Sequence, residues 1–299
     1  MPSVLNSNPL RAAAAGAILI AFSAFYVHSA DVSPATAAFF RCVYALPLLG
    51  LMTWREHQRF GSRPRSDQVL GKVGGILFGA NLVLWHYAIE YVGTGLATVL
   101  SNTQVVIVGL LAWAILGEKP DRRVLVAVGV VLGGVVLISG LADDQAFGAQ
   151  PVLGAMIGLA NGFCYAGFLL ILRRGLHDLR RMAAPIFDAV LVASAVAAVV
   201  GLIAGDLNVV PSWPAHGWLL LLALGSQVLA WLLISVSLPR LPAVETSLIL
   251  LLQPVGALLI GVVILSEAPS ILQVIGACMI LSGVAISSLK RPAKTTPSG

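Results

Sequence analysis

The segment QPVGALLIGVVILSEAP, residues 253–269, decides the fold, because a looser copy of it stands earlier in the same chain. That copy, QVVIVGLLAWAILGEKP, occupies residues 104–120 and lies at an offset of 149 residues (253 minus 104). Both copies begin with Gln and run through an apolar stretch into a Glu-x-Pro turn. Chance similarity between Leu- and Val-rich segments is the alternative, but the aligned polar and Gly positions favour an internal repeat. The aligned positions are Gln104 and Gln253, Leu110 and Leu259, Ile115-Leu116 and Ile264-Leu265, Glu118 and Glu267, Pro120 and Pro269, Gly134-Val135 and Gly283-Val284, and Ser139 and Ser288.

The composition of the chain is that of a membrane protein. Of the 299 residues, 58% are apolar and 10% are charged, and the mean hydropathy is +0.94; soluble domains carry about 25% charged residues. A spanning helix needs about 20 mostly apolar residues, and a backbone in lipid satisfies its hydrogen bonds within the segment. The sequence therefore predicts an all-α integral membrane protein with ten transmembrane helices. The predicted spans are residues 10–28, 34–54, 70–90, 94–116, 122–140, 151–172, 184–204, 215–237, 242–265 and 270–289.

The basic residues indicate how these spans are oriented. All of the 18 Lys and Arg residues except Arg41 lie at the start of the first predicted span, in or directly beside alternate connections, or after the last span. The opposite connections carry acidic residues such as Asp143 and Glu267. Because cytoplasmic loops are enriched in Lys and Arg, both termini are predicted to be cytoplasmic. The net charge of +5 then reflects membrane topology, and no nucleic-acid partner is expected.

The two halves of the repeat are predicted to be inverted relative to each other. Each half contains five predicted spans, and an odd number of crossings turns the second copy upside down in the bilayer. Inverted repeats related by an axis in the membrane plane are typical of transporters, whose solute site lies near the midplane between the repeats. The sequence therefore favours a transporter with a central cavity.

The strings AWAILGEKP (residues 112–120) and QPVGALLIGVVILSEAP (residues 253–269) resemble the end of an EamA domain in the drug/metabolite transporter superfamily. The resemblance covers both halves. It implies a first five-helix unit at residues 10–141, a second at residues 150–290, and a cytoplasmic tail at residues 291–299. It further implies a ten-helix transporter of small molecules in a bacterial inner membrane. Overall likeness is greatest to bacterial exporters of aromatic and other neutral amino acids.

Polar and aromatic residues within the predicted spans are the candidates for solute contact, because such groups are costly in a membrane and usually face the bundle interior. Asn161, Tyr165 and Phe168, for example, follow one helical stripe. The alternative is that Asn and Gln side chains only tie helices together, and that His86 is a neutral, packed histidine. The candidate cavity residues are Ser23, Asn81, Trp85, His86, Ser101, Gln104, Asn161, Tyr165, Gln227, Trp231, Gln253 and Pro254.

Few charged residues lie inside the predicted spans. Arg41, Asp188 and Glu245 stand near span ends, where they can reach an interface or pair. A structural or gating role is expected for them, with direct contact to the solute as the alternative. Pro254 removes a backbone donor from the middle of its span and is predicted to open a carbonyl there. Many members of the family carry Glu where this chain has Gln253. Without that carboxylate, the hypothesis is facilitated diffusion by alternating access.

This inventory suits a neutral or zwitterionic solute with an apolar side chain, since aromatic faces bind such groups and attract ammonium. We therefore expect an exporter of neutral or aromatic amino acids that uses no ATP, because the chain has no phosphate-binding GxxxxGK[ST] motif. An exporter of other small neutral metabolites or drugs stays open. So does an integral-membrane lipid-modifying enzyme, although the chain lacks its acid/base or metal motifs. No catalytic residue, metal or cofactor is expected, and the sequence leaves the oligomeric state open.

Overall fold

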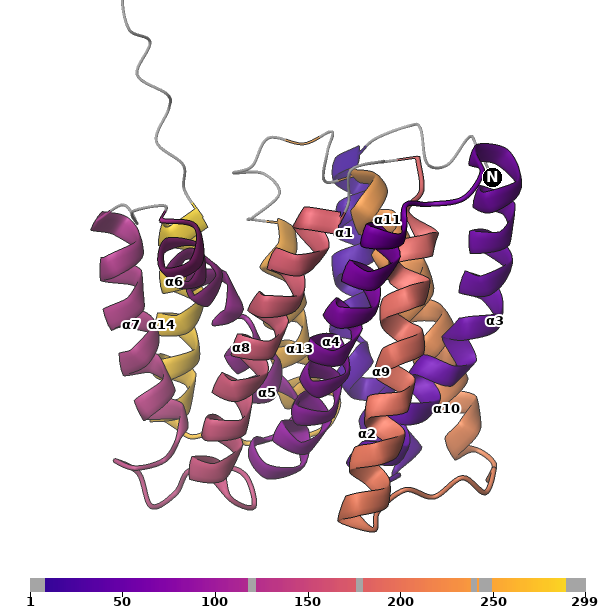
Figure 1. Cartoon of the computed structure of the whole chain (residues 1–299). Coiled ribbons are helices and arrows are strands. Elements are labelled where there is room, and N and C mark those ends of the chain that lie inside the picture. Colours follow the sequence, from indigo (N-terminus) through magenta and orange to yellow (C-terminus); the bar gives the residue numbers. More distant parts are fainter. Residues whose placement is uncertain (1–8, 118–121, 176–179, 238–240, 242–248, 289–299) are drawn as a thin grey trace, which may run out of the picture.

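The computed structural model describes residues 9–117, 122–175, 180–237, 241 and 249–288, and within these ranges it contains helices and no strand. The helices pack into one bundle (Figure 1). In chain order they are α1 (Pro9–Ala21), α2 (Ser23–Ala30), α3 (Pro34–Phe60), α4 (Arg65–Val92), α5 (Thr94–Ser101), α6 (Gln104–Leu116), α7 (Arg122–Ile138), α8 (Pro151–Gly175), α9 (Ala183–Ala204), α10 (Ala215–Leu221), the π-helix η1 (Leu222–Ala230), α11 (Trp231–Ser237), α13 (Leu252–Val263) and α14 (Ile271–Ser288).

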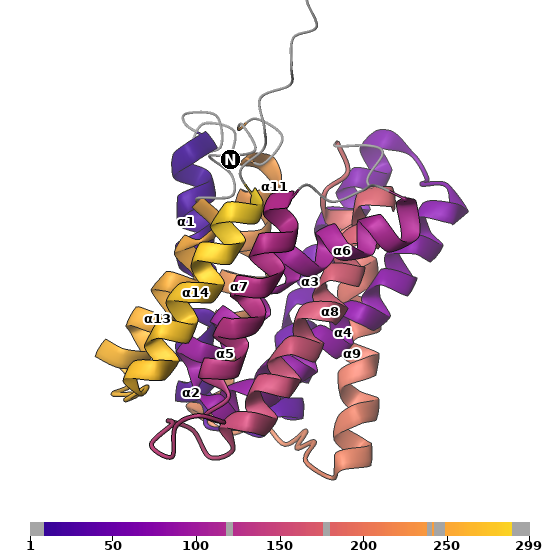
Figure 2. The ribbon, with the colours of Figure 1, turned by 90° about the vertical axis from the view of Figure 1, so that its left-hand side faces the viewer.

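The helices have the length and composition of a multi-pass membrane protein. Within the described residues, 8 helical stretches are long and apolar enough to cross a membrane. Two further apolar helices, α7 and α13, are shorter, with 17 and 12 residues. They lie beside α14 and α5 respectively (Figure 2). The ninth predicted span begins with residues 242–248, which are outside the described residues, so ten spans stay a prediction.

Three of the predicted spans that the structure describes in full are interrupted, which hydropathy did not indicate. The first run divides into α1 and α2 at Phe22, the fourth divides into α5 and α6, and the eighth contains η1. In the fourth run, the Asn102 side chain donates to the Thr98 carbonyl at 2.9 Å, while the Asn102 backbone N–H turns to Val99. A short amide side chain thus competes with the helical backbone and breaks the helix. All three segments remain apolar, so a hydropathy average reads each as one span.

The two halves run in opposite directions. We call the edge at which α1 begins and α14 ends the upper edge, and the edge at which α2 ends and α8 begins the lower edge (Figure 1). The first helices of the N-terminal half descend from the upper edge, whereas α8, the first helix of the C-terminal half, rises from the lower edge. This is the inverted arrangement that an odd number of crossings per half predicts.

Contacts between α7 and α14 are reciprocal at the positions that the repeat aligns. A Cβ atom on Gly134 of α7 would lie 2.6 Å from the Gly276 carbonyl oxygen and 2.8 Å from the Ile280 side chain. A Cβ atom on Gly283 of α14, which the repeat aligns with Gly134, would lie 2.7 Å from the Val131 side chain and 3.2 Å from a carbonyl oxygen of α7. Small residues let the two backbones approach closely, as is usual in membranes.

The core of the bundle forms where α4 packs against α8 and α9. Gly75 and Gly79 face α9 so closely that added Cβ atoms would meet the Ala189 carbonyl at 2.7 Å and the Ala193 Cα at 2.9 Å. Between these helices and α3 lie buried apolar side chains, including Leu49, Leu82 and Val190. This packing fixes the position of α4, which supplies more side chains to the candidate functional site than any other helix.

Candidate functional site

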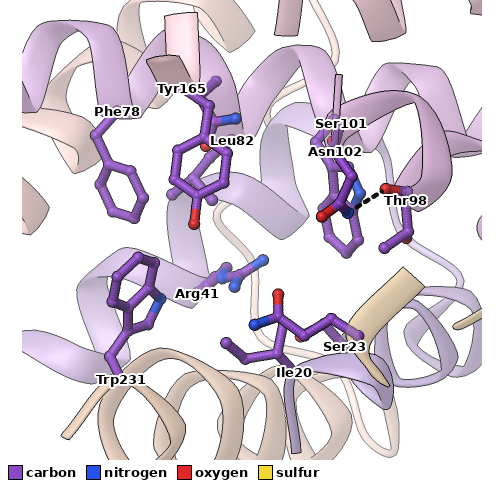
Figure 3. Close-up of a pocket in the computed structure, with 13 residues that line it drawn as sticks. Ile20, Ser23, Arg41, Phe78, Leu82, Thr98, Ser101, Asn102, Tyr165 and Trp231 are labelled. Carbon is purple, nitrogen blue, oxygen red and sulfur yellow. Dashed lines mark hydrogen bonds between the residues drawn. The ribbon is translucent and has the colours of Figure 1, made fainter. Parts of the chain in front are cut away.

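A cavity of about 80 Å³ lies in the centre of the bundle, between the two halves of the chain (Figure 3). Helices α1 to α5 of the first half and helices α8, α11 and α13 of the second half contribute side chains to its lining. The lining mixes aromatic rings, neutral hydrogen-bonding side chains and one charge. The lining residues are Ile20, Ser23, Arg41, Phe78, Asn81, Leu82, Trp85, Thr98, Ser101, Asn102, Tyr165, Trp231 and Gln253.

A second cavity, of about 220 Å³, adjoins the first. The two share Ile20, Asn102, Tyr165, Trp231 and Gln253 in their linings. The second also reaches Gln104 on α6 and Ser288, the last residue of α14, at the upper edge. The combined space therefore leads from the centre of the bundle toward the upper edge.

Breaks in the helices border this space. Gln104 is the first residue of α6, after the break at Asn102, and Gln253 is the second residue of α13. These two glutamines are aligned by the repeat, so corresponding helix starts from both halves face the cavity. Discontinuous helices beside a central site are a recurring feature of transporters.

Pro254 lies in the first turn of α13, not in the middle of a helix, because α13 begins at Leu252. Residues 249 and 250 are helical and Leu251 is not, so the run is broken directly before α13, and a carbonyl freed by Pro254 stays a prediction. A Pro in the first turn is tolerated, since a backbone N–H at that position has no helical partner. Pro254 is buried and lies outside the cavity lining.

A model of the EamA-like transporter family matches residues 10–140 and again residues 152–289. The protein belongs to the EamA-like transporter family. As a member of the drug/metabolite transporter superfamily, it is a membrane transporter built from two EamA units, which the internal repeat had indicated.

The fold of this EamA-like transporter also occurs in solved structures. One, described only as "Crystal structure of protein", is 18% identical, covers 93% of this chain and 95% of its own, and superposes with a TM-score of 0.60. At that identity the likeness concerns the fold alone. No curated protein matches the sequence.

The structure brings most of the predicted cavity residues of this EamA-like transporter to the cavity. Ile20, Phe78, Leu82, Thr98 and Asn102 also line it, although they were not among the candidates. Thr98 and Asn102 share a helical face with Ser101, so the polar spacing could have included them. Ile20 and Leu82 carry no signal that separates them from lipid-facing residues. The predicted residues in the linings are Ser23, Asn81, Trp85, Ser101, Gln104, Tyr165, Trp231 and Gln253.

Three other predicted residues are buried next to the cavity lining but do not line the cavity themselves. Asn161 is fully buried; it accepts a hydrogen bond from Asn81 and donates one to Ser101 at 2.6 Å. His86 is hydrogen-bonded through Nδ1 to the Leu82 carbonyl at 2.7 Å and does not line the cavity. Gln227, in η1, reaches Arg41. These side chains therefore position the residues that do line the cavity.

Arg41 lies deeper in the protein than the sequence indicated. It is 5% exposed and lines the cavity, whereas an interfacial position was expected. Its Nε donates to the Gln227 Oε1 at 2.8 Å, and its guanidinium lies 5.5 Å from the centre of the Trp85 ring. Hydropathy gives the position of a residue along a span but not the direction of its side chain, and α3 directs Arg41 inward.

Aromatic rings form a cluster on the α8 and α11 side of the cavity. Phe78 stacks on Phe168 with ring centres 4.6 Å apart, and Tyr165 stacks on the same ring at 6.4 Å. Trp231 meets both Phe78 and Tyr165 edge-on, at 6.4 and 6.5 Å. Such rings offer rigid apolar area and a polar edge to a bound side chain.

Polar contacts link segments of the two halves at the lower edge. The Glu267 carboxylate accepts hydrogen bonds at 2.6 Å from both the backbone N–H and the hydroxyl of Thr94, and at 3.2 Å from the N–H of Gly95. It thereby caps the N-terminus of α5, where a negative charge is favourable. Elsewhere on this edge, the Tyr87 hydroxyl donates to Asp206 at 2.7 Å.

The other predicted charged residues are away from the cavity. Asp188 on α9 forms an ion pair with Arg63, which lies between α3 and α4 at the upper edge. Nearby, the Glu56 carboxylate accepts from the N–H groups of Ala183 and Ala184, which begin α9. Glu245 lies outside the described residues. The Asp188 contact fits the structural role expected of it.

We expect Asn161→Leu to destabilise the protein more than loss of another buried polar side chain. The leucine leaves the Asn81 amide and the Ser101 hydroxyl without their partners, and each buried unpaired group costs about 1–3 kcal/mol. Unfolding in mixed detergent micelles measures this change in free energy. Ser194→Ala is the matched control, because among the described residues the buried Ser194 hydroxyl donates only to the Leu191 carbonyl of its own helix. Equal stability of the two variants would show that the amide network is not structural.

Proposed function

We propose that this transporter exports neutral or aromatic amino acids by alternating access through the central cavity, without ATP. The observation that carries the proposal is the composition and position of the cavity. Both repeats line it, it lies mid-bundle, and its wall consists of aromatic rings and neutral hydrogen-bonding groups around one arginine. This wall offers binding partners for both the charged groups and the apolar side chain of a zwitterion.

The closure of one edge and not the other supports alternating access. The cavity extends toward the upper edge, while Glu267 and Asp206 take part in polar contacts that close the lower edge. Basic residues at the end of α3 and the start of α4, including Arg55 and Arg65, lie at the upper edge. With ten spans in a bacterial inner membrane, that edge is the cytoplasmic one, and both termini are cytoplasmic. The described conformation is then open to the inside.

Counterflow in proteoliposomes tests the proposed function. Vesicles loaded with unlabelled amino acid should accumulate the labelled one, with L-phenylalanine, L-tryptophan, L-leucine and L-alanine compared in turn. We expect Trp231→Ala to lower the rate at least about tenfold, because a buried aromatic contact contributes about 1.5–3 kcal/mol. Trp54→Ala is the matched control, since Trp54 is 57% exposed on α3 and away from the cavity.

Other results would change the proposed function in defined ways. Counterflow of neutral metabolites or drugs, with none for any amino acid, would replace the substrate and leave the transport cycle in place. Accumulation that needs an imposed pH gradient would exclude facilitated diffusion. If Trp231→Ala and Trp54→Ala lower the rate equally, Trp231 in the cavity is no more important for transport than an exposed tryptophan. That result would contradict transport through the cavity.

A further inference from the structure

Arg41 is a buried cation whose environment contains no described carboxylate. The Asp188 carboxylate, at the upper edge, is paired with Arg63. Around Arg41 the described partners are the Gln227 amide oxygen and the Trp85 ring. A buried charge without a counter-ion is costly in a membrane, so such residues usually mark a substrate or ion pathway.

The contacts of Arg41 fix one side of its guanidinium and leave the other to the cavity. The Nε–H is bound by Gln227 at 2.8 Å, and Gln227 is itself held in the π-helix η1 with 1% exposure. Within the described part of the chain, the two terminal NH₂ groups have no hydrogen-bond acceptor. In Figure 3 the guanidinium stands in the middle of the cavity, between Tyr165 and Trp231 on one side and Ser101 and Asn102 on the other. The planar pair of NH₂ groups matches a carboxylate, which accepts two parallel hydrogen bonds.

Ser23 gives a second, independent indication of a ligand. Its hydroxyl oxygen is buried, lines the same cavity, and has no hydrogen-bond partner among the described residues. Buried hydroxyl groups are rarely left unpaired in a folded protein. A solute oxygen that accepts from both Arg41 and Ser23 would satisfy this group.

We propose that Arg41 binds the carboxylate of the transported solute, so that the substrate class is carboxylates with an apolar or aromatic side chain. This rests on the proposed function and names the chemical group by which the solute is recognised. The carboxylate is the group that the protein recognises, whereas the α-ammonium group is dispensable. Arylpropionates are then ligands, and the corresponding amines and alcohols are not.

Binding of four compounds that share a phenyl ring tests the proposal on wild-type protein in nanodiscs. They are L-phenylalanine, 3-phenylpropionate, 3-phenylpropanol and phenethylamine, measured by calorimetry at pH 7. We expect 3-phenylpropionate to bind at least about tenfold more tightly than 3-phenylpropanol, as charge-assisted hydrogen bonds require. Equal affinities for the acid and the alcohol would overturn the proposal without any variant.

Two variants examine the arginine itself. In Arg41→Gln the acid should lose its advantage over the alcohol, while Arg41→Lys should keep part of it. In Gln227→Glu a carboxylate replaces an amide of nearly the same shape beside Arg41, so the internal negative charge should exclude the acid and lower its affinity about tenfold. Retention of wild-type preference in both Arg41→Gln and Gln227→Glu would exclude Arg41 as the anchor. If Arg41→Gln does not fold, Gln227→Glu and the four compounds on wild-type protein decide whether Arg41 binds the carboxylate.

The same samples separate this proposal from the proposed function. Arg41-dependent binding of 3-phenylpropionate, with no counterflow of any amino acid, would remove amino-acid export and keep the carboxylate anchor. Counterflow of amino acids that 3-phenylpropanol and 3-phenylpropionate inhibit equally would keep amino-acid export and remove the anchor.

Discussion

Gly134→Val is expected to prevent folded protein from accumulating. A Cβ atom at this position would stand 2.6 Å from the Gly276 carbonyl oxygen and 3.1 Å from the Ile280 backbone nitrogen. Because both atoms belong to the backbone of α14, no side chain can rotate away to make room. The helices have to separate along the contact that joins the two repeats, which we expect to cost about 3 kcal/mol or more. Size-exclusion chromatography of detergent extracts and the thermal unfolding midpoint measure the loss.

Gly129→Val is the matched control for this substitution. Gly129 lies on the same helix, α7, and a Cβ atom there would meet nothing within 4 Å. The change in helix propensity is the same in both variants, so any difference between them reports the contact with α14. Normal yield and stability of Gly134→Val would mean that α7 and α14 do not pack as described.

Glu267→Ala is expected to open the lower edge of the bundle. The variant removes the three hydrogen bonds to Thr94 and Gly95 and the negative charge at the N-terminus of α5. Hydrogen bonds to a charged group contribute about 1.5–3 kcal/mol each. Their loss should therefore shift the equilibrium between the closed and open conformations of the lower edge toward the open one by at least about tenfold. A cysteine at Ser101, in a chain without Cys42, Cys164 and Cys278, reports this opening. Its labelling by a membrane-impermeant maleimide added outside right-side-out vesicles should become about tenfold faster.

A second carboxylate at the lower edge gives the control. Glu90 is exposed near the end of α4, so Glu90→Gln removes a charge from that edge without removing a helix cap. In the Glu90→Gln variant, the cysteine at position 101 should be labelled at a rate within about twofold of the parent. The reason is that exposed charges contribute little to stability. Unchanged labelling in Glu267→Ala would show that this cap does not hold the lower edge closed.

Much of the site could be anticipated because polar residues within apolar spans are rare. Asn81, Trp85 and Tyr165 were candidates for that reason, and each lines the cavity. Asn161 was a candidate on the same grounds, yet it lies behind the wall and holds Asn81 and Ser101. Helical spacing defines a face, and a buried face can point at a cavity or at another helix.

Arg41 illustrates a second limit. Its place along the chain indicated a charge near a span end, and long basic side chains there usually extend to the interface. The structure instead turns it inward, because Gln227 from the other half of the chain receives its Nε–H and Trp85 lies beside its guanidinium. No local pattern pairs residues 41 and 227.

The membrane class, the family and the doubled architecture could all be derived from the order of residues, because hydropathy and an internal repeat are properties of the chain itself. An apolar stretch of spanning length has to become a helix in lipid, whatever surrounds it. The helix breaks, the polar contacts across the lower edge and the direction of each polar side chain were settled only by tertiary packing. These features depend on which residues from distant segments meet, such as Glu267 with Thr94. Neither segment's own sequence indicates which residue of the other segment it will bond.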